Sequence, residues 1–167
     1  MNRRAERGFT LVEIMIVVAI IALLAAIAIP NILRGRTSAN ESAAIGNVRA
    51  VVSSIEMFRS VNNTVPVAGT WAAQMYPGGG QPAFGPPSFN GALGGVLAVQ
   101  GYNYTYVDNQ GTGAYTLVAT PVTLNTTGTR SFFANESGAV RHCVGTGTAG
   151  GGPNWATLDA APTNPCT

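Results

Sequence analysis

The clearest pattern along the chain is an uninterrupted apolar run near its beginning. Sixteen consecutive apolar residues extend from Ile14 to Ile29, and the longer stretch from Phe9 to Ile29 contains a single charged residue, Glu13. A helix rises about 1.5 Å per residue, so residues 9–29 would extend about 32 Å, enough to cross the hydrocarbon core of a bilayer. The pattern therefore predicts a membrane-spanning helix.

The charges around the apolar run indicate how such a helix would lie in a membrane. Three arginines precede it, within residues 1–8, and two follow it, at Arg34 and Arg36. By the positive-inside rule, this arrangement favours a cytoplasmic N-terminus and an exported C-terminal body. A cleaved secretory signal with a cut site at Ala26-Ile27-Ala28 and an ordinary single-pass anchor are the two alternatives.

Glu13 is difficult to explain by either alternative. A carboxylate inside a membrane helix costs about 2.5–3.5 kcal/mol on insertion scales, and such residues usually have a function. In the first helical turns its charge suits the positive end of the helix dipole, yet it still lacks a full partner. If the chain begins at Phe9, the α-amino group of Phe9 in a neighbouring copy, with a pKa of about 8, could pair with Glu13 at neutral pH.

The helical pattern resumes after Pro30 in amphipathic form. The apolar residues of the segment 45–58 fall within an arc of about 140°, as in a helix docked on a body. The residues of this arc are Ile45, Val48, Val51, Val52, Ile55 and Phe58, whereas Ala50, Ser53 and Ser54 lie elsewhere. Pro30 and Gly35 weaken the intervening turns, through a lost hydrogen bond and through backbone entropy. The helix is expected to end at Asn62-Asn63-Thr64.

The remainder of the chain predicts a loop followed by short strands. Residues 64–100 are rich in Gly, Pro and Ala, which is typical of a loop. Strand patterns follow at residues 102–107, 115–119, 131–134 and 139–144, with a turn at Asn135-Glu136-Ser137-Gly138 between the last two. The predicted fold is α+β: a long N-terminal helix, membrane-spanning in its first half and amphipathic in its second, packed on a C-terminal antiparallel β-sheet head.

Composition changes the picture of the surface. Charged residues make up only 10% of the chain, against roughly 25% in soluble domains. All nine basic residues are arginines, which excludes a lysine-dependent mechanism. Residues 62–167 carry five charges, so Thr, Asn, Ser and Gly supply the polarity. One interpretation is a surface that packs against copies of itself without strong charge repulsion, and the alternative is simply an exported domain with a Thr-rich surface. In either case, the low charge disfavours nucleic-acid binding driven by phosphate contacts.

Two patterns resemble ligand-binding or catalytic chemistry without its required context. The G-x-G-x-x-G match at residues 145–150 is followed by Gly151-Gly152-Pro153, which prevents the helix that a nucleotide site requires. His142 is the single histidine, and on a strand its neighbour Cys143 points to the opposite face, which disfavours a Cys–His pair. His142 with both cysteines supplies only three zinc ligands. We therefore expect no catalytic residues, cofactor or metal.

The most specific signal in the sequence lies at Arg7-Gly8-Phe9-Thr10-Leu11-Val12-Glu13. This segment resembles the class III leader of the type IV pilin and pseudopilin superfamily, a short basic leader ending in Gly before a Phe-Thr-Leu-x-Glu start to a long apolar helix. The close resemblance covers about the first 35 residues, through Ile29-Pro30-Asn31. Residues 129–141 also resemble the late hairpin of some pilins and pseudopilins.

This resemblance implies roles for individual residues. A prepilin peptidase would cut between Gly8 and Phe9, the new amino group of Phe9 would be methylated, and Glu13 would serve subunit assembly. The turns around Pro30 and Gly35 would either unwind during assembly or form a simple kink at the membrane surface. The chain then comprises a prepilin leader (residues 1–8), an N-terminal helix (9–61) and a globular pilin head (62–167).

By the same resemblance, the protein is a structural subunit of a type IV pilus, similar to type IVa major pilins, and not an enzyme. It would be held in the inner membrane and polymerised with itself into an extracellular filament by the pilus assembly machinery. No specific nucleic-acid partner is expected. A pseudopilin of a type II secretion system is one alternative, and a minor pilin acting as adhesin or DNA-uptake module is another.

The two cysteines, Cys143 and Cys166, both lie in the part of the chain expected to be exported. An oxidising compartment favours a disulfide between them, which would contribute roughly 3–4 kcal/mol by closing the intervening loop. Two unrelated buried thiols are the alternative. The loop 143–166 resembles the Cys-bounded loop that pilins expose on the filament, whereas pseudopilins of the main type usually have a calcium-binding loop there.

Overall fold

The computed structural model describes residues 9–79, 82–91, 93 and 97–145, and the chain divides into two compact units, residues 1–35 and 36–167. Helix α1 (Leu11–Asn62) begins in the first unit and ends in the second. It is helical throughout, Pro30 and Gly35 included. Asn63 ends the helix in the left-handed conformation, at φ 56°, and its N–H donates to the Arg59 carbonyl at 2.8 Å.

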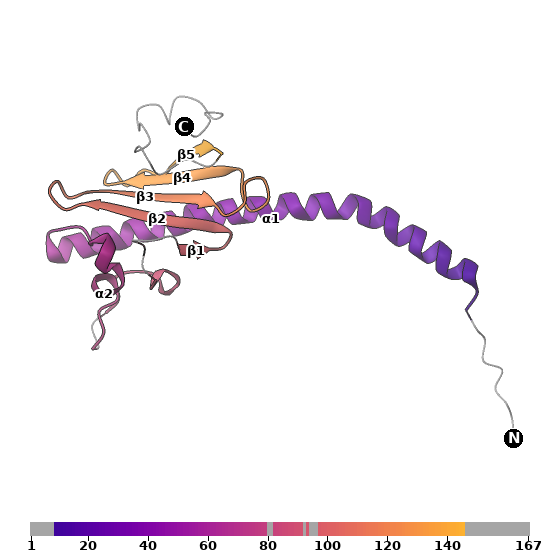
Figure 1. Ribbon diagram of the computed structural model, residues 1–167, viewed down its shortest axis with the longest axis horizontal. Helices are drawn as coiled ribbons and strands as arrows, with labels where there is room; N and C mark the ends of the chain where they lie inside the picture. The colour runs from indigo at the N-terminus through magenta and orange to yellow at the C-terminus, as the bar shows by residue number, and fades with distance from the viewer. Residues whose placement is uncertain (1–8, 80–81, 92, 94–96, 146–167) are drawn as a thin grey trace, which may run out of the picture. The chain divides into compact units, whose positions relative to one another are not determined.

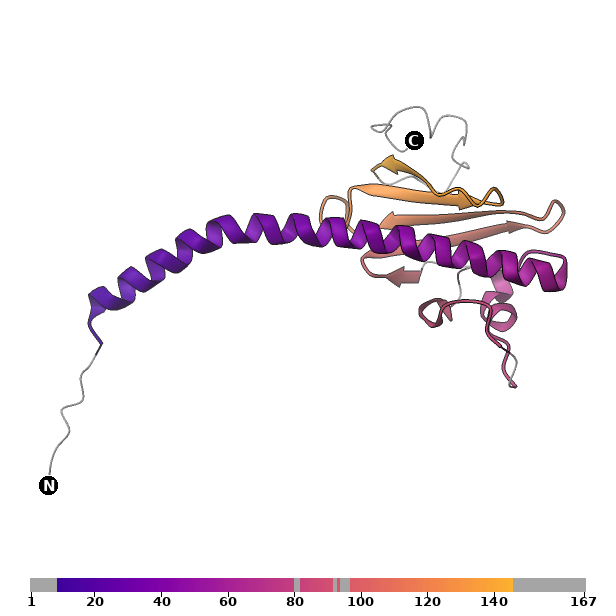
Figure 2. The same ribbon diagram turned by 180° about the vertical axis from the view of Figure 1, so that it is seen from behind.

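Within its described residues, the second unit contains a five-stranded antiparallel sheet, and residues 62–167 of this unit are called the head. The strands are β1 (Leu97–Val99), β2 (Tyr102–Asn109), β3 (Ala114–Pro121), β4 (Arg130–Asn135) and β5 (Arg141–Val144). They pair in the order β1-β2-β3-β4-β5, so that neighbours in sequence are neighbours in the sheet. The C-terminal part of α1 lies along one face, behind the sheet in Figure 1 and in front of it in Figure 2. The predicted α+β fold is confirmed.

The amphipathic part of α1 packs on the sheet with nearly the predicted residues. Its buried residues are Glu41, Ala44, Val48, Val51, Val52, Ser54, Ile55 and Phe58. Ile45 is only partly buried. The prediction that Ser54 lies away from the packed face is wrong. Burial is tolerated because the Ser54 hydroxyl donates to the Ala50 carbonyl at 2.7 Å, which satisfies the polar group within the helix.

Three alternating tyrosines of β2 fill the space between the sheet and α1. Tyr102, Tyr104 and Tyr106 are each at most 1% exposed and belong to the same core as the buried residues of the helix. Tyr102 and Tyr106 donate their hydroxyls to main-chain carbonyls, and the Tyr104 hydroxyl accepts from Asn47 Nδ2 at 3.1 Å. Burial raises the pKa of all three phenols, so they remain neutral in the core.

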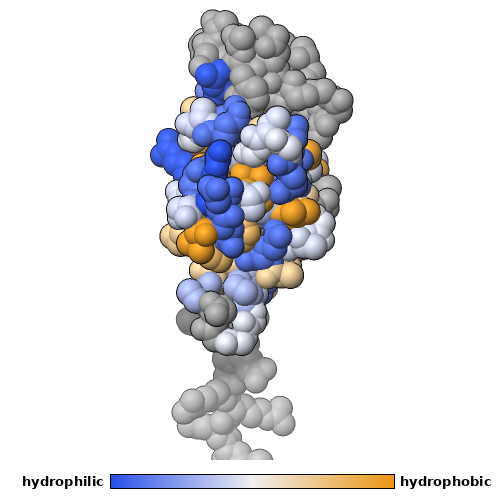
Figure 3. Space-filling model, turned by 90° about the vertical axis from the view of Figure 1, so that its left-hand side faces the viewer, coloured by the Kyte–Doolittle hydropathy of each residue, from blue (hydrophilic) through white to orange (hydrophobic). Residues whose placement is uncertain are grey.

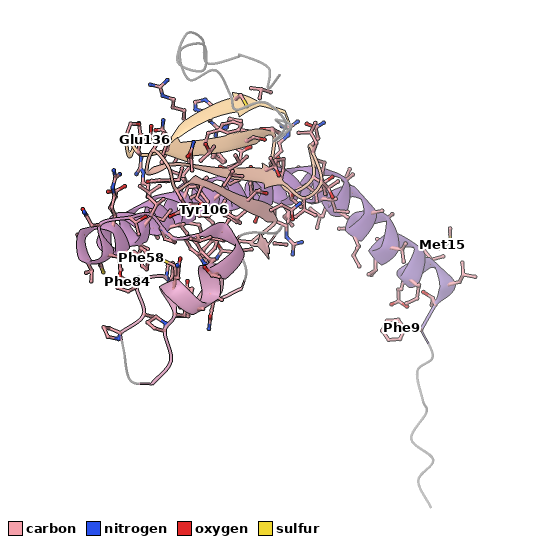
Figure 4. The ribbon with its side chains drawn as sticks, turned by 60° about the vertical axis from the view of Figure 1, so that its left-hand side comes forward. Phe9, Met15, Phe58, Phe84, Tyr106 and Glu136 are labelled. Atoms are coloured by element: carbon pink, nitrogen blue, oxygen red, sulfur yellow. The ribbon has the colours of Figure 1, made fainter. Side chains whose placement is uncertain are left out.

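The prediction of a loop over residues 64–100 is only partly correct. This segment contains 3₁₀ turns at Ala68–Thr70 and Pro87–Phe89, helix α2 (Trp71–Met75) and the edge strand β1. The buried Trp71 ring lies 4.9 Å from the Tyr106 ring, and its Nε1–H donates to the Phe89 carbonyl at 3.1 Å. Phe84 packs edge-on against Phe58, with centroids 5.3 Å apart (Figure 4). Single aromatic residues therefore order a segment with a loop-like composition.

The four predicted strands are present. The first three are longer than predicted, whereas the last begins at Arg141 rather than at residue 139. The predicted turn between the last two is confirmed, because the Gly138 N–H donates to the Asn135 carbonyl at 2.9 Å and Gly138 has a φ of 71°. On the face of the sheet away from α1, a second small cluster contains Val118, Phe133 and Cys143. Successive side chains of a strand point to opposite faces of the sheet, so Phe132 of β4 lies in the main core and Phe133 lies in the second cluster.

Candidate functional site

The first unit presents an apolar helical surface. From Leu11 to Leu33, the large apolar side chains are between 50% and 74% exposed. Figure 4 shows two of the apolar side chains at this end of the chain, Phe9 and Met15, directed away from the helix axis. By length and composition, α1 is able to cross a membrane. Apolar surface of this extent marks contact with a membrane or with other protein subunits.

Thr10 and Glu13 hydrogen bond to each other at the beginning of α1. Glu13 Oε2 accepts from the Thr10 N–H at 2.9 Å and from the Thr10 hydroxyl at 2.8 Å. In return, the Glu13 N–H donates to Thr10 Oγ1 at 3.3 Å. This arrangement is a capping box, in which the residue before the helix and the residue three positions later satisfy donors that the first turn leaves unpaired.

The capping box uses one oxygen of the Glu13 carboxylate and fixes its direction. Among the described residues, Glu13 forms no ion pair, and its Oε1 atom accepts no hydrogen bond. The carboxylate also lies at the positive end of the helix dipole. In apolar surroundings a carboxylate is stable only when it is paired. The arrangement therefore presents an oriented anionic acceptor at the end of an apolar helix.

Sequence reasoning identified Glu13 but missed Thr10. The signal was available, because Thr10-Leu11-Val12-Glu13 matches the T-x-x-E capping pattern directly before an apolar run. The structure also refines the expectation that the carboxylate lacks a full partner. Thr10 provides two neutral donors to one oxygen, whereas no described residue provides a cation.

The other predicted site residues are distributed along the chain. Pro30 and Gly35 lie within α1, and unwinding or kinking there stays a prediction. Cys143 lies on β5 and is buried, whereas Cys166 is outside the described residues, so the disulfide also stays a prediction. Gly8 lies outside the described residues too, and cleavage after it remains to be tested.

The residues that resembled catalytic chemistry are placed by strand alternation. The His142 ring lies 6.4 Å from the ring of Phe132, whereas Cys143 belongs to the cluster on the other face of the sheet. The two side chains therefore point away from each other. Within the described ranges, no three His, Cys, Asp or Glu side chains gather where they could hold a metal ion. The glycine-rich segment after Gly145 lies outside those ranges.

Comparison with known proteins identifies the same N-terminal region. Residues 3–29 match the family described as the prokaryotic N-terminal methylation motif. The chain is 32% identical to the type II secretion system core protein G of Aeromonas hydrophila over 66 residues. This aligned region makes up 40% of this chain and 46% of that protein. Over 61 residues it is 44% identical to the type IV wide pilus major component PilA4 of Thermus thermophilus, 36% of this chain and 47% of that protein.

A third relative is the type IV major pilin protein PilA of Myxococcus xanthus, which is 50% identical over 55 residues, 33% of this chain and 25% of that protein. The matched part of the chain spans just under half the length of the first relatives. No solved structure matches the chain. The three relatives described are named as core or major components of secretion systems and pili rather than as enzymes. On its methylation motif and these relatives, the N-terminal part of the chain is similar to proteins of the type IV pilin and pseudopilin superfamily.

Proposed function

We propose that the protein is a structural subunit of a type IV pilus, polymerised through the first half of α1 into a surface filament. The observation that carries the proposal is the beginning of α1, where a capped carboxylate with an unoccupied oxygen precedes an exposed apolar helix. The subunit would have no catalytic role. Before assembly it would be held in the inner membrane by the apolar half of α1, with the head exported.

Processing would create the partner that Glu13 requires. Cleavage by a prepilin peptidase between Gly8 and Phe9 would release a new amino group, and a methylated amine remains cationic at neutral pH. Phe9 is 83% exposed and therefore accessible to a neighbouring subunit. Its amino group would pair with Glu13 Oε1 of that neighbour, so that neither charge enters the apolar filament interior unpaired.

Assembly by this route depends on specific contacts rather than on hydrophobic burial. Transfer of a helix from lipid to a bundle of similar helices yields little hydrophobic free energy, because lipid tails are as apolar as leucine. The ion pair and helix packing would provide the specificity, and the pilus assembly machinery would provide the work. The low charge of residues 62–167, five charged side chains, is compatible with close contact between copies. Figure 3 shows one end of the head, where hydrophilic residues surround small, separate hydrophobic areas.

Two observations support a pilus subunit over a pseudopilin. Identity to the two pilus proteins is 44% and 50%, whereas identity to the type II secretion proteins is 32%, 33% and 36% for the first three. In addition, the calcium-binding loop expected of pseudopilins requires several acidic side chains, whereas Asp159 is the single acidic residue after His142. A pseudopilin remains the second candidate, because proteins of that kind are among the relatives and would share the leader, the helix and Glu13.

The test separates the two candidates by where the assembled subunit is found. Filaments sheared from cells that express the chain should contain it as an abundant protein beginning at Phe9, identified by mass spectrometry. Cells whose only copy is Glu13→Leu should retain processed subunits in the membrane and lose the sheared filaments. Glu56→Gln is the matched control, since Glu56 is a half-exposed acid of the same helix. Its ion pair with Arg59 is long, at 3.9 Å, and a glutamine can still accept the hydrogen bond of 3.4 Å from the Tyr115 hydroxyl. Normal filaments from Glu13→Leu cells would contradict the proposal.

A further inference from the structure

Polar side chains replace apolar ones where α1 joins the head. The packed part of the helix from Ala44 to Phe58 is mostly apolar, but the preceding turn contacts the segment between β3 and β4 through hydrogen bonds. Asn40 Nδ2 donates to the Thr127 carbonyl at 3.0 Å, and the Thr37 hydroxyl donates to the Thr126 carbonyl at 3.4 Å. The turn of α1 that contains Thr37 and Asn40 is therefore held by hydrogen bonds, whereas the following part of the helix is held mainly by apolar packing.

Glu41 is the centre of these contacts. Its side chain is only 8% exposed, yet both carboxylate oxygens are fully used. Oε1 accepts from the Thr129 N–H at 2.8 Å and from the Thr129 hydroxyl at 2.6 Å. Oε2 accepts from Arg130 Nε at 2.9 Å and from Arg130 Nη2 at 2.6 Å. Four donors, two of them on a guanidinium fork, make this a strong and directional interaction.

The partners of Glu41 are themselves fixed by the sheet. The Arg130 guanidinium lies 5.9 Å from the centroid of the Phe132 ring, and the Arg130 carbonyl accepts from the Tyr102 hydroxyl at 2.9 Å. Among the described residues, Arg130 is the charged group that bonds to Glu41. Tyr102 on β2 is the neighbouring titratable group. Asn40 and Thr37, on the same helix as Glu41, carry no charge. The pairing is therefore controlled by the charge of one carboxylate.

We propose that Glu41, Thr129 and Arg130 form a charge clamp that limits how far α1 can open from its N-terminal side. Pro30 and Gly35 weaken the helix shortly before the clamp, by a missing hydrogen bond and by backbone entropy. Opening that begins there stops at the clamp, and the apolar segment from Ala44 onward stays packed on the sheet. Loss of the carboxylate charge moves this boundary toward Ala44.

The charge clamp is sensitive to acid. Burial alone raises the pKa of the Glu41 carboxyl, but the hydrogen bonds from Thr129 and Arg130 and the charge of Arg130 outweigh burial and hold the pKa below its usual value. A carboxyl with a lowered folded pKa stabilises the fold at pH values above its unfolded pKa. The contribution is lost as the pH falls below that value and through the lowered folded pKa. The phenol of Tyr102, with a pKa raised by burial, stays neutral throughout this range.

Hydrogen–deuterium exchange on the full chain in detergent micelles tests the clamp. In Glu41→Gln at neutral pH, amides of residues 36–43 and 122–130 should exchange about tenfold faster, or more, than in the unmodified protein, whereas residues 48–58 and 102–119 should be unchanged. Glu56→Gln is the control and should change neither pair of segments. Unchanged exchange in the first two segments would overturn the proposal. So would an equal increase throughout the head, which would make Glu41 a general stabilising residue.

Two further variants keep the test independent of how well Glu41→Gln folds. Thr129→Val removes the hydroxyl donor at nearly constant volume and should accelerate exchange in the same two segments to a smaller extent. Arg130→Lys keeps the charge but loses the guanidinium fork, and its effect should be intermediate. Because these measurements use unassembled subunits, they do not depend on the proposed pilus function. Normal clamp behaviour in a protein that forms no filament would contradict only that function.

Acid titration provides the last arm of the experiment. The denaturant midpoint of the unmodified chain should exceed that of Glu41→Gln at pH 7, and the two midpoints should converge as the pH falls below the ordinary pKa of a glutamic acid. A difference that persists unchanged at the acid end would show that the carboxylate charge is not what holds the helix, and would overturn the clamp.

Discussion

Gly128 provides the space that the Tyr102 hydroxyl occupies. A Cβ atom at position 128 would overlap the oxygen and Cζ of the tyrosine, which are held in place because the hydroxyl donates to the Arg130 carbonyl. The absence of a side chain at this one position therefore allows β2 to be tied to the beginning of β4. The same contact supports the residue that pairs with Glu41.

Gly128→Ala should destabilise the head by about 1–3 kcal/mol, the usual cost of forcing an extra methyl group into a packed site. Equilibrium denaturation of the full chain in detergent micelles measures it. Gly46→Ala is the matched control, because Gly46 is on the exposed side of α1 and a Cβ there would meet nothing within 4 Å. The control should be neutral or stabilising by up to about 1 kcal/mol. Equal stabilities for the two variants would contradict the steric explanation.

Thr10→Ala should remove the side-chain half of the capping box and leave the Glu13 carboxylate without its orienting hydroxyl. The expected cost is about 1 kcal/mol at the helix N-terminus. Filament yield, compared with the amount of processed subunit in the membrane fraction, should fall, whereas Thr10→Ser should remain near normal because it keeps the hydroxyl. If both variants form filaments normally, the capping box has no part in assembly.

Replacing Gly8 with a bulky residue should block N-terminal processing. Gly8→Leu protein should retain its full leader and accumulate in the membrane, whereas Gly8→Ala should be processed at least in part. Intact mass measurement of membrane-fraction protein distinguishes the two products, and fragmentation locates methylation on Phe9. Mature protein that still carries Met1, or that begins at Ile29, would show that the leader interpretation is wrong.

Cys143 and Cys166 should be linked in exported protein. Non-reducing peptide mass analysis should recover the linked pair, and alkylation before reduction should label neither cysteine. Cys143→Ala should then loosen residues 144–167 first, because loop closure is lost while the helix and β2 to β4 keep their own contacts. The alanine avoids placing a hydroxyl in the cluster with Val118 and Phe133. Alkylation of both thiols in the folded protein would exclude the disulfide.

The elements with strong periodic signals could be predicted from the sequence. The apolar arc of α1, the alternating tyrosines of β2 and the turn ending at Gly138 all express local geometry, and the structure places them as expected. The resemblance to the pilin and pseudopilin superfamily also followed from one short segment, because a basic leader ending in Gly before a Phe-Thr-Leu-x-Glu start to a long apolar helix is a specific combination. The role of Thr10 was also available from local geometry, because a capping box joins residues three positions apart.

The segment between α1 and β2 could not be predicted in the same way. Helix α2 has five residues, too few for a helical period to be visible, and β1 has three. Their positions depend on Trp71 and Phe89, which contact residues distant in sequence. The Glu41 pair also joins residues 89 positions apart, so no local pattern announces it. The burial of Ser54 could not be predicted either, since helical periodicity alone does not show that its hydroxyl is hydrogen bonded within the helix.

The meander order of the sheet has a practical consequence for engineering the chain. Consecutive turns alternate between the two ends of the sheet. The Gln100–Gly101 turn and the segment before Arg130 lie at the end near Asn40 and Glu41. The turns at 109–113 and 135–138 lie at the opposite end. Loop tips of this kind accept inserted sequence most readily. A peptide tag after Glu136, an exposed residue labelled in Figure 4, would leave every strand register intact and provide a handle for imaging the subunit.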